Sequence, residues 1–326
     1  MTRTSYVPSP TKIKVVGLGG AGCNAITRMV REHIHGVEFI AMNTDVQHLE
    51  ITEAPVRIAL GERLTQGLGA GGDHILGRRC AEETRDEIER ALARADMVFV
   101  AAGMGGGTGT GAIPVVAEVA KQSGALTIAV VTKPFTFEGK QRMQVAEEGI
   151  SQLVTKVDTL IIVPNDRLLK LSDQKTTVDS AFKLADETLC QAVQAIAEVI
   201  TVPGLINVDF AGVRAIMKDS GPAWMCIGQA SGQNRAVKAA KEALSSPLLD
   251  ISISGAKNVL FRVAGGSNLS LFEVNEAAKV IQQAVDPEAN IIFGVVVDPN
   301  MGNEVRLTLI ATGFPAKDQR PAPSRG

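Results

Sequence analysis

Short apolar runs alternate along the chain with longer stretches in which apolar residues recur every three or four positions. The runs have the length of buried strands, and the periodic stretches that of amphipathic helices. In the first half, the expected strands are 12–17, 38–43, 97–102, 125–132 and 159–164. Expected helices at 25–32, 78–95, 113–122 and 143–153 lie between them. This alternation predicts an α/β fold with a Rossmann-like parallel sheet.

The longest helical pattern runs from Val178 to Ile200 and ends before Pro203. After it, strands are expected at 225–228, 258–264, 290–297 and 304–312, with helices at 234–245 and 271–285. They predict a second α/β domain with a mixed sheet. The predicted organisation is a disordered arm (1–11), a first domain (12–175), a central helix (176–202), a second domain (203–314) and a disordered tail (315–326).

Composition excludes several classes of function. The 326 residues carry a formal net charge of −2 and contain no basic cluster, so no nucleic-acid partner is expected. The longest apolar runs are strand-sized, and the N-terminal residues lack a signal-peptide core. We therefore expect a cytoplasmic protein without direct membrane insertion. The four cysteines and four histidines have no metal-ligand spacing, so a zinc or disulfide framework is not expected.

The glycine-rich run 103–111 lies between an expected strand and an expected helix. Such a turn can bring unpaired backbone N–H groups to a helix N-terminus, where the helix dipole also favours an anion such as phosphate. The Lys-Ser/Thr pair of a Walker P-loop is missing, because Ala112 and Ile113 follow. The charge would then be met by the backbone, the dipole and a metal ion. The alternative is a tight strand-to-helix connection.

Two further glycine loops occupy 17–24 and 67–72. The first is similar to a dinucleotide-binding fingerprint, which favours a nicotinamide-dependent oxidoreductase as one alternative. Such a protein needs an acidic residue ending the second strand, whereas this chain has Asn43-Thr44-Asp45 there. Those three residues also suit a polar turn that caps a helix. Three glycine loops are expected to line one edge of a parallel sheet.

The string GGGTGTG at 105–111 resembles the signature of the tubulin/FtsZ superfamily. NTDVQ at 43–47 and KPFTFEGKQR at 133–142 are similar to FtsZ motifs, and the resemblance extends from residue 12 to 314. It implies a GTP-binding cytoskeletal protein that assembles head to tail into protofilaments for cell division, as a ring at the division site. GTP or GDP and Mg²⁺ are the implied cofactors, with Mg²⁺ on the phosphates and no protein ligand assigned. The implied partners are the chain itself and unidentified division proteins. The family's long linker and C-terminal peptide are not found, so membrane anchoring through this chain is not expected.

The resemblance also implies which residues contact the nucleotide. Asn24 and Asp186 would recognise guanine, and the loop 67–72 would face the γ-phosphate. Glu138 and Arg142 would contact the ribose and the phosphates. Without it, Glu138 and Arg142 are an ordinary helix ion pair, Phe182 a core residue and Asp186 a solvated charge. The complete predicted set is Gly20, Ala21, Gly22, Cys23, Asn24, Asn43, Asp45, Ala70, Gly71, Gly103, Gly105, Gly106, Gly107, Thr108, Gly109, Thr132, Pro134, Glu138, Arg142, Asn165, Phe182 and Asp186.

The segment 207–213 reads NVDFAGV, where the FtsZ family carries NxDFADV. In that family the loop enters the neighbouring subunit's nucleotide pocket and polarises the attacking water. Asn207 and Asp209 are therefore the candidate catalytic residues, while Gly212 replaces the family's second aspartate. From the residues alone, a loop acid or a helix cap is the better interpretation of Asp209. Gly212 predicts slow hydrolysis, and it favours the alternative of a GTP-bound scaffold that assembles but scarcely turns over.

Overall fold

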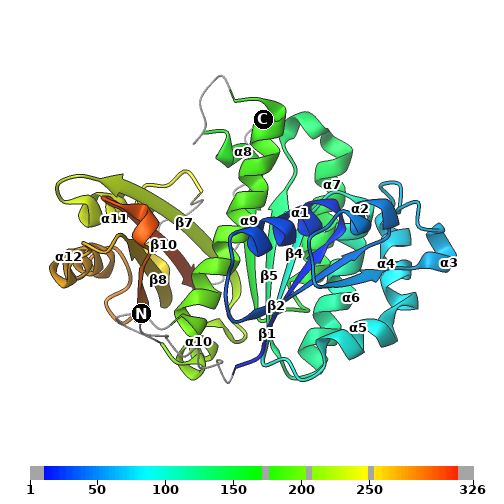
Figure 1. Ribbon diagram of the computed structural model, residues 1–326, viewed down its shortest axis with the longest axis horizontal. Helices are drawn as coiled ribbons and strands as arrows, with labels where there is room; N and C mark the ends of the chain where they lie inside the picture. Colours follow the sequence, from blue (N-terminus) through cyan, green and yellow to red (C-terminus); the bar gives the residue numbers. More distant parts are fainter. Residues whose placement is uncertain (1–10, 171–175, 203–207, 249–252, 315–326) are drawn as a thin grey trace, which may run out of the picture.

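A computed structural model describes residues 11–170, 176–202, 208–248 and 253–314 of the chain (Figure 1). Its strands form a single ten-stranded sheet in the order β3-β2-β1-β4-β5-β6-β7-β10-β8-β9. The strands are β1 (Ile13–Leu18), β2 (Val37–Asn43), β3 (Val56–Ala59), β4 (Met97–Gly103), β5 (Leu126–Lys133), β6 (Thr159–Pro164), β7 (Gly221–Ser231), β8 (Asn258–Gly265), β9 (Asn290–Val297) and β10 (Glu304–Thr312).

The first six strands are parallel and are covered by helices on both faces. Apolar residues of α1 (Gly19–Arg31) and α9 (Val178–Thr201) form the core on one face. Residues of α4 (His74–Glu83), α5 (Arg85–Leu92), α6 (Gly107–Gln122) and α7 (Lys140–Leu153) form the core on the other. The strand order reverses between β1 and β4, and parallel α/β sheets bind ligands at such a reversal, beyond the carboxyl ends of the strands.

The remaining strands form a mixed extension of the same sheet. β10 is antiparallel to β7 and β8, while β8 and β9 are parallel. The helices α11 (Arg235–Leu244) and α12 (Leu271–Gln282) pack on it around a third core. The predicted fold class is confirmed, but the two expected sheets are continuous. β6 and β7 join them through three parallel residue pairs, Thr159–Gly221, Leu160–Pro222 and Ile161–Ala223.

The central helix α9 belongs to both halves of the molecule. Its buried residues share one apolar core with β1 and β5 on one side and with β7, β8 and β10 on the other. A buried ion pair joins Glu198 of α9 to Arg262 of β8. The remaining described α-helices are short: α2 (Val46–Glu50), α3 (Glu62–Thr65), α8 (Asn165–Leu168) and α10 (Phe210–Met217). Three 3₁₀ helices are also described: η1 (Thr136–Glu138), η2 (Ile253–Gly255) and η3 (Pro299–Met301).

Two helices begin earlier in the sequence than predicted, and a third predicted helix is divided into two in the structure. α1 starts at Gly19 rather than near residue 25, and α6 at Gly107 rather than near 113. The glycines are poor helix formers, but here they allow close packing. A Cβ at Gly111 would lie 2.1 Å from the His74 carbonyl oxygen, and one at Gly77 would lie 2.2 Å from that of Gly107. The predicted helix 78–95 is two helices, α4 and α5, because the backbone leaves helical geometry at Thr84.

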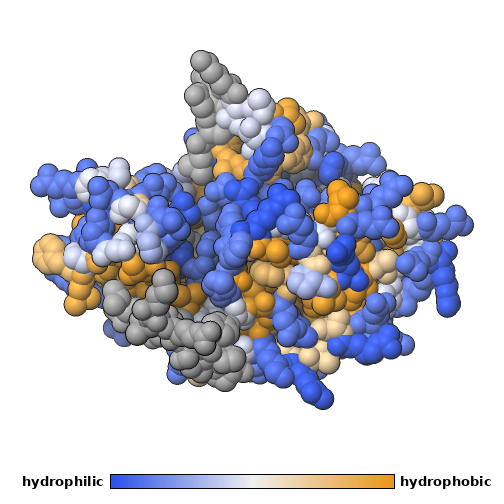
Figure 2. Space-filling model, viewed as in Figure 1, coloured by the Kyte–Doolittle hydropathy of each residue, from blue (hydrophilic) through white to orange (hydrophobic). Residues whose placement is uncertain are grey.

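The surface gives no sign of a membrane-spanning element among the described residues, where no helix combines the necessary length with an apolar composition. The face drawn in Figure 2 is mostly hydrophilic, with smaller apolar patches between the charged side chains. All four cysteines are buried and unpaired. The predicted arm (except Thr11), the predicted tail and Asn207 lie outside the described residues.

Candidate functional site

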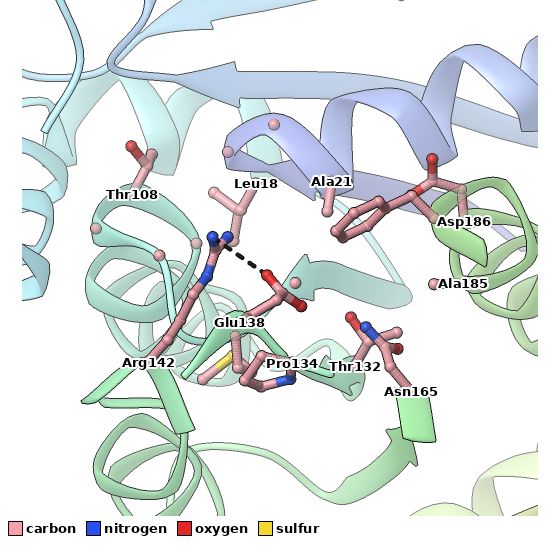
Figure 3. A pocket seen from close by; sticks show the side chains of 18 residues that line it. Leu18, Ala21, Thr108, Thr132, Pro134, Glu138, Arg142, Asn165, Ala185 and Asp186 are labelled. Carbon is pink, nitrogen blue, oxygen red and sulfur yellow. Dashed lines mark ion pairs between the residues drawn. The ribbon is translucent and has the colours of Figure 1, made fainter. Parts of the chain in front are cut away.

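A cavity lies at the carboxyl ends of β1, β4, β5 and β6, beside the strand-order reversal. The structure brings most of the predicted nucleotide-binding residues together around it (Figure 3). Those that line it are Gly20, Ala21, Gly103, Gly106, Gly107, Thr108, Gly109, Thr132, Pro134, Glu138, Arg142, Asn165, Phe182 and Asp186.

One end of the cavity is formed by two helix N-termini. α1 begins after Leu18 and α6 after Gly106, and neither terminus has a side-chain cap or an acidic residue in its first turn. Their first N–H groups therefore remain available as donors, and both helix dipoles place partial positive charge at the cavity. No heavy atom lies within 4 Å of where a Cβ would stand at Gly20 or Gly106. The backbone at these positions is open to a closely approaching anion.

The glycine run is held in place by hydroxyl groups. The Thr110 hydroxyl accepts from the Gly105 N–H at 2.8 Å, and the hydroxyls of Thr108 and Thr44 are 2.6 Å apart. Gly105 has φ +94°, a conformation that glycine adopts easily. These bonds fix the turn independently of any ligand.

The third glycine loop borders an adjoining cavity. Gly71 and Gly105 line this second cavity, which shares Gly106, Gly107, Glu138 and Arg142 with the first. Ala70 is buried behind it. Unlike α1 and α6, α4 is capped, because Asp73 accepts from the N–H groups of Ile75 and Leu76. The loop therefore borders the end of the site that the α1 and α6 N-termini form, but the N-terminus of its own helix, α4, is already capped.

The other end of the cavity carries acceptors. Figure 3 shows Asp186 and Asn165 at the end opposite Thr108. Burial raises the pKa of the Asp186 carboxyl from 3.8 to about 7, while Arg28 and a hydrogen bond from Asn24 lower it. Asn165 is buried, and its Oδ1 has no hydrogen-bond partner within the described part of the chain. A buried acceptor without a donor is costly, so this end suits a ligand that presents N–H or O–H groups.

An aromatic cluster flanks the acceptor end. The Phe182 ring is 5.4 Å from that of Phe135 and 6.3 Å from that of Phe137, edge to face in both cases. Phe182 is 39% exposed and Phe137 58% exposed. The interpretation of Phe182 as an ordinary core residue is therefore wrong, and its exposed ring can stack on a flat ligand.

An ion pair lies between the two ends. Arg142 of α7 and Glu138, which precedes this helix in a 3₁₀ turn, are 3.2 Å apart, and Glu138 also accepts from the Phe135 N–H at 2.8 Å. The Glu138 side chain is nearly buried, whereas that of Arg142 is 51% exposed. Glu138 thus anchors the loop and Arg142, and the guanidinium keeps donors free for an anion.

Six predicted residues line neither cavity: Asn24 and Ala70, described above, and Gly22, Cys23, Asn43 and Asp45. Gly22 packs on the opposite side of α1, where a Cβ would be 2.5 Å from the Ala101 carbonyl oxygen. Cys23 is fully buried, and burial raises the pKa of its thiol to about 12. Asp45 caps α2 through the His48 N–H, and Asn43 is buried beneath it with its Oδ1 3.4 Å from the Asp45 N–H. The helix-cap interpretation of this turn thus describes Asp45.

The cavity also includes residues that the sequence did not single out: Leu18, Gly19, Met104 and Ala185. Thr44, which bonds to Thr108, was likewise missed. Gly19 and Met104 lie inside the glycine-rich loops, so the spacing of those loops could have included them. Ala185 precedes Asp186 on α9 and has no chemical signal of its own.

The candidate catalytic segment lies away from the cavity of its own chain. Asp209 caps α10, accepting from the Gly212 N–H at 2.8 Å, and Figure 1 shows α10 at the opposite end of the sheet from α8. The side chain of Asp209 is exposed. It cannot act on a ligand in the same molecule's cavity.

The described residues contain no group of three or more His, Cys, Asp or Glu side chains that could hold a metal ion.

Fold and cavity together define an α/β nucleotide-binding protein. Residues 12–173 match the model of the GTPase domain of the tubulin/FtsZ family, and residues 221–315 match that of the FtsZ family C-terminal domain. The chain is 48% identical to an empty FtsZ dimer from M. jannaschii, with a TM-score of 0.91 and coverage of 93% of this chain and 88% of that one. The chain belongs to the tubulin/FtsZ family, and the predicted resemblance is confirmed.

More distant relatives share the fold. CetZ2 from Haloferax volcanii, solved as a GTPγS-bound protofilament, is 20% identical with a TM-score of 0.79, and 94% of each chain is covered. CetZ1 from the same organism, solved as a GDP-bound monomer, is 22% identical with a TM-score of 0.80, covering 94% of this chain and 95% of that one.

Proposed function

We propose that the protein binds GTP, assembles head to tail into protofilaments of the cell-division machinery in the cytoplasm, and hydrolyses GTP slowly where two subunits meet. The observation that carries this proposal is the polarity of the cavity. Uncapped helix N-termini form one end, and the acceptors Asp186 and Asn165 form the other. The phosphates of a nucleoside triphosphate need hydrogen-bond donors, which the helix N-termini supply. The base of the nucleotide then lies at the other end, where it must donate hydrogen bonds to Asp186 and Asn165.

Guanine meets this requirement better than adenine. Its Watson–Crick edge presents an N1–H and an amino group, whereas adenine has an acceptor at N1. An ionised Asp186 can accept both guanine donors, and adenine would leave this half-buried carboxylate facing a lone pair. Phe182, which lines the cavity and is 39% exposed, offers a face on which the base can stack.

Hydrolysis is proposed to require a second copy of the chain. Asp209 is exposed at the end of the molecule remote from its own cavity, so a head-to-tail contact can carry it to the cavity of the next molecule. Exposed apolar residues occur beside the phosphate end, with Leu68 79% and Ile75 63% exposed, and also at the start of α12, where Leu271 and Phe272 are each 73% exposed. Such residues suit burial between subunits. A head-to-tail contact that does not close into a ring forms a filament.

In the proposed reaction, the helix N-termini and Arg142 hold the phosphates, and Asp209 of the adjacent subunit orients a water for in-line attack on the γ-phosphorus. Bound Mg²⁺ would neutralise part of the charge that develops on the phosphate oxygens. Gly212 removes one of the two carboxylates that the family sets against this water, which is the reason for proposing slow turnover.

The dependence of the GTPase rate on protein concentration tests this proposal. A site completed by two molecules should give a rate per molecule that is near zero at low concentration and rises steeply above a threshold. Phosphate release across a dilution series, with sedimentation of polymer in the same samples, measures both. A rate per molecule that is independent of concentration would mean that each subunit hydrolyses alone.

Two alternatives are separated by the same assays. A GTP-bound scaffold, favoured by Gly212, would pellet with GTP but release no phosphate above the rate without enzyme. A nicotinamide-dependent oxidoreductase would bind NADH in preference to GTP. Against it, the second strand ends in Asn43, and the next acid, Asp45, is engaged in capping α2.

GTP binding is expected to depend on pH through Asp186. Because its pKa is about 7, the carboxyl is mostly protonated at pH 6 and mostly ionised at pH 8. Only the ionised form accepts both guanine donors, so GTP affinity should rise about tenfold between these pH values. Asp186→Ala should weaken binding by about 1 to 3 kcal/mol and remove this rise. Fluorescence titration with a labelled GTP analogue would measure both effects.

The raised pKa of Asp186 also makes the free energy of unfolding depend on pH. The unfolded carboxyl has its ordinary pKa of 3.8, so it releases its proton at lower pH than the folded one. The contribution of Asp186 to the free energy of unfolding should therefore decrease as pH rises from 3.8 to about 7. A parent protein whose GTP affinity is the same at pH 6 and pH 8, or that binds ATP equally well, would contradict the role assigned to Asp186.

A further inference from the structure

The turn Asn43-Thr44-Asp45 lies beside the nucleotide cavity, but none of its residues lines that cavity or the adjoining one. The two outer residues fix the turn, because the Asp45 N–H donates to Asn43 Oδ1 at 3.4 Å and Asp45 caps α2. Thr44 follows the last residue of β2 and is only 1% exposed. Its hydroxyl and its carbonyl oxygen each bond to an element that borders the phosphate end, the end formed by the α1 and α6 N-termini.

The Thr44 hydroxyl holds α6. Its oxygen is 2.6 Å from the hydroxyl oxygen of Thr108, the second residue of α6, and both residues are buried. Neither hydroxyl has another hydrogen-bond partner in the described part of the chain. One of them therefore donates to the other, and removing either would leave a buried hydroxyl unpaired.

Thr108 also lies against α1. A Cβ at Gly19, the first residue of α1, would be 3.4 Å from the Thr108 Cβ and 3.0 Å from the Gly109 nitrogen. The N-termini of α1 and α6 thus meet at Thr108, which Figure 3 shows at the end of the cavity opposite Asp186. By holding this residue, Thr44 fixes the N–H donors of the two helices relative to each other.

The backbone of the same turn holds the loop 67–72. The Gly69 N–H donates to the Thr44 carbonyl oxygen at 3.1 Å, and the Val46 N–H donates to the Gly67 carbonyl oxygen at 3.0 Å. Gly71, two residues further along the loop, lines the adjoining cavity. Thr44 is therefore bonded to two of the three glycine-rich segments, one through its side chain and one through its backbone.

We propose that Thr44 is a positioning residue for the phosphate end, an inference that rests on the proposed function. It touches no ligand and acts through Thr108 and Gly69. Because one residue joins α6 to the loop 67–72, a ligand that orders the α6 N-terminus also orders the loop.

The affinity for GTP tests the link to α6. Thr44→Val removes the hydroxyl and should weaken GTP binding at least about fivefold, whereas Thr44→Ser keeps the hydroxyl and should stay within about twofold of the parent. Thr127→Val is the control, because it removes a buried hydroxyl at the amino end of β5, away from the cavity. All variants are compared where chemical denaturation shows that they are folded. Parental affinity in Thr44→Val, or an equal loss in Thr127→Val, would overturn the proposal.

A double-mutant cycle separates positioning from a general loss of stability. Thr108→Val removes the partner hydroxyl, so adding Thr44→Val to it should cause no further loss of GTP affinity. Losses that multiply in the double variant would mean that Thr44 does not act through Thr108, contrary to the proposal.

Hydrogen exchange of the Gly69 amide tests the link to the loop. Saturating GDP is the probe, because it lacks the terminal phosphate that the family resemblance places against this loop. GDP should slow exchange at Gly69 at least about threefold in the parent and in Thr44→Ser, but not in Thr44→Val. Equal slowing in Thr44→Val would overturn the coupling. If Thr44→Val does not fold, Thr108→Val breaks the same bond and decides the question.

Failure of the proposed function has a different signature. A parent protein that binds neither GTP nor GDP would overturn the proposed function, and the role of Thr44 with it. A parent that binds both nucleotides, with affinity and exchange unchanged in Thr44→Val, would overturn the role of Thr44 alone.

Discussion

Replacing Gly106 by valine is expected to abolish nucleotide binding while leaving the fold intact. Gly106 is the N-cap of α6, with φ −94° and ψ 171°, an extended conformation that any residue adopts. A Cβ there meets no heavy atom within 4 Å, because it would project into the cavity. The added side chain would occupy the space of the phosphates and block the N–H groups behind it. We expect a loss of affinity of at least about a hundredfold.

A neighbouring position provides the contrast. At Gly107, a Cβ would lie 2.9 Å from the Ala70 Cβ and 3.0 Å from backbone atoms of Asp73. Its φ is not positive, so close packing against this loop, rather than backbone conformation, is what demands glycine. Gly107→Val should therefore lower the free energy of unfolding as well as the affinity, and the two variants should differ in chemical denaturation.

Gly106→Ala completes the series, and its affinity should fall between those of the parent and the valine variant. Valine at the N-cap is also expected to cost the fold about 1 kcal/mol, which denaturation would register. A Gly106→Val protein that is folded and binds GTP as the parent does would show that the α6 terminus is not a phosphate site.

Gly212→Asp is expected to raise the rate of GTP hydrolysis about a hundredfold. Position 212 is in the first turn of α10, three residues after its cap, where an acidic side chain is favoured by the helix dipole. The new carboxylate would stand beside Asp209, so that both could act on a water in the neighbouring subunit. A general acid or base in place typically contributes about 10² to 10⁴ in rate.

The structure also indicates what the substitution must overcome. A Cβ at position 212 would be 3.1 Å from both Asp209 Oδ1 and Val208 Cγ1, so these side chains must move by a few tenths of an ångström. Neither is buried. Part of any change in rate could therefore come from moving Asp209, and a control of equal size is needed.

Gly212→Asn is that control, because it has the shape of aspartate without its charge. If the carboxylate matters, phosphate release should rise in the Asp variant and stay near the parent rate in the Asn variant, while equal amounts of polymer sediment with GTP and Mg²⁺. Equal rates in the two variants would show that the missing carboxylate does not limit turnover.

Much of the fold follows from apolar periodicity alone. β9 and β10 have the predicted bounds, and the parallel strands of the first half lie within a residue or two of them. β3 was missed because it is short and half exposed, with one buried residue of its four. The continuity of the sheet depends on three residue pairs at Gly221, Pro222 and Ala223, none of which has a strong strand preference.

The two ends of the site were not equally predictable. Glycine-rich loops before helices indicate a phosphate end by general chemistry, although they do not distinguish glycines that face the ligand from Gly111, which packs α6 closely against α4. At the other end, Asp186 and Phe182 were assigned through the family resemblance, because a lone acid or phenylalanine on a long helix has simpler explanations. The raised pKa of Asp186 and the unpaired oxygen of Asn165 arise from tertiary burial. No local pattern contains that information.

The core that α9 shares with both halves of the sheet has a thermodynamic consequence. Unfolding the second half alone would expose the face of α9 that packs on β7, β8 and β10, and it would leave Glu198 without the guanidinium of Arg262. Unfolding the first half alone would remove the partners of the same helix on its other side. Neither half can therefore melt without the other losing much of its apolar burial. Although two separate family models describe it, we expect the chain to unfold as one cooperative unit, so that a substitution in the distant strands of the sheet also lowers the stability of the nucleotide cavity.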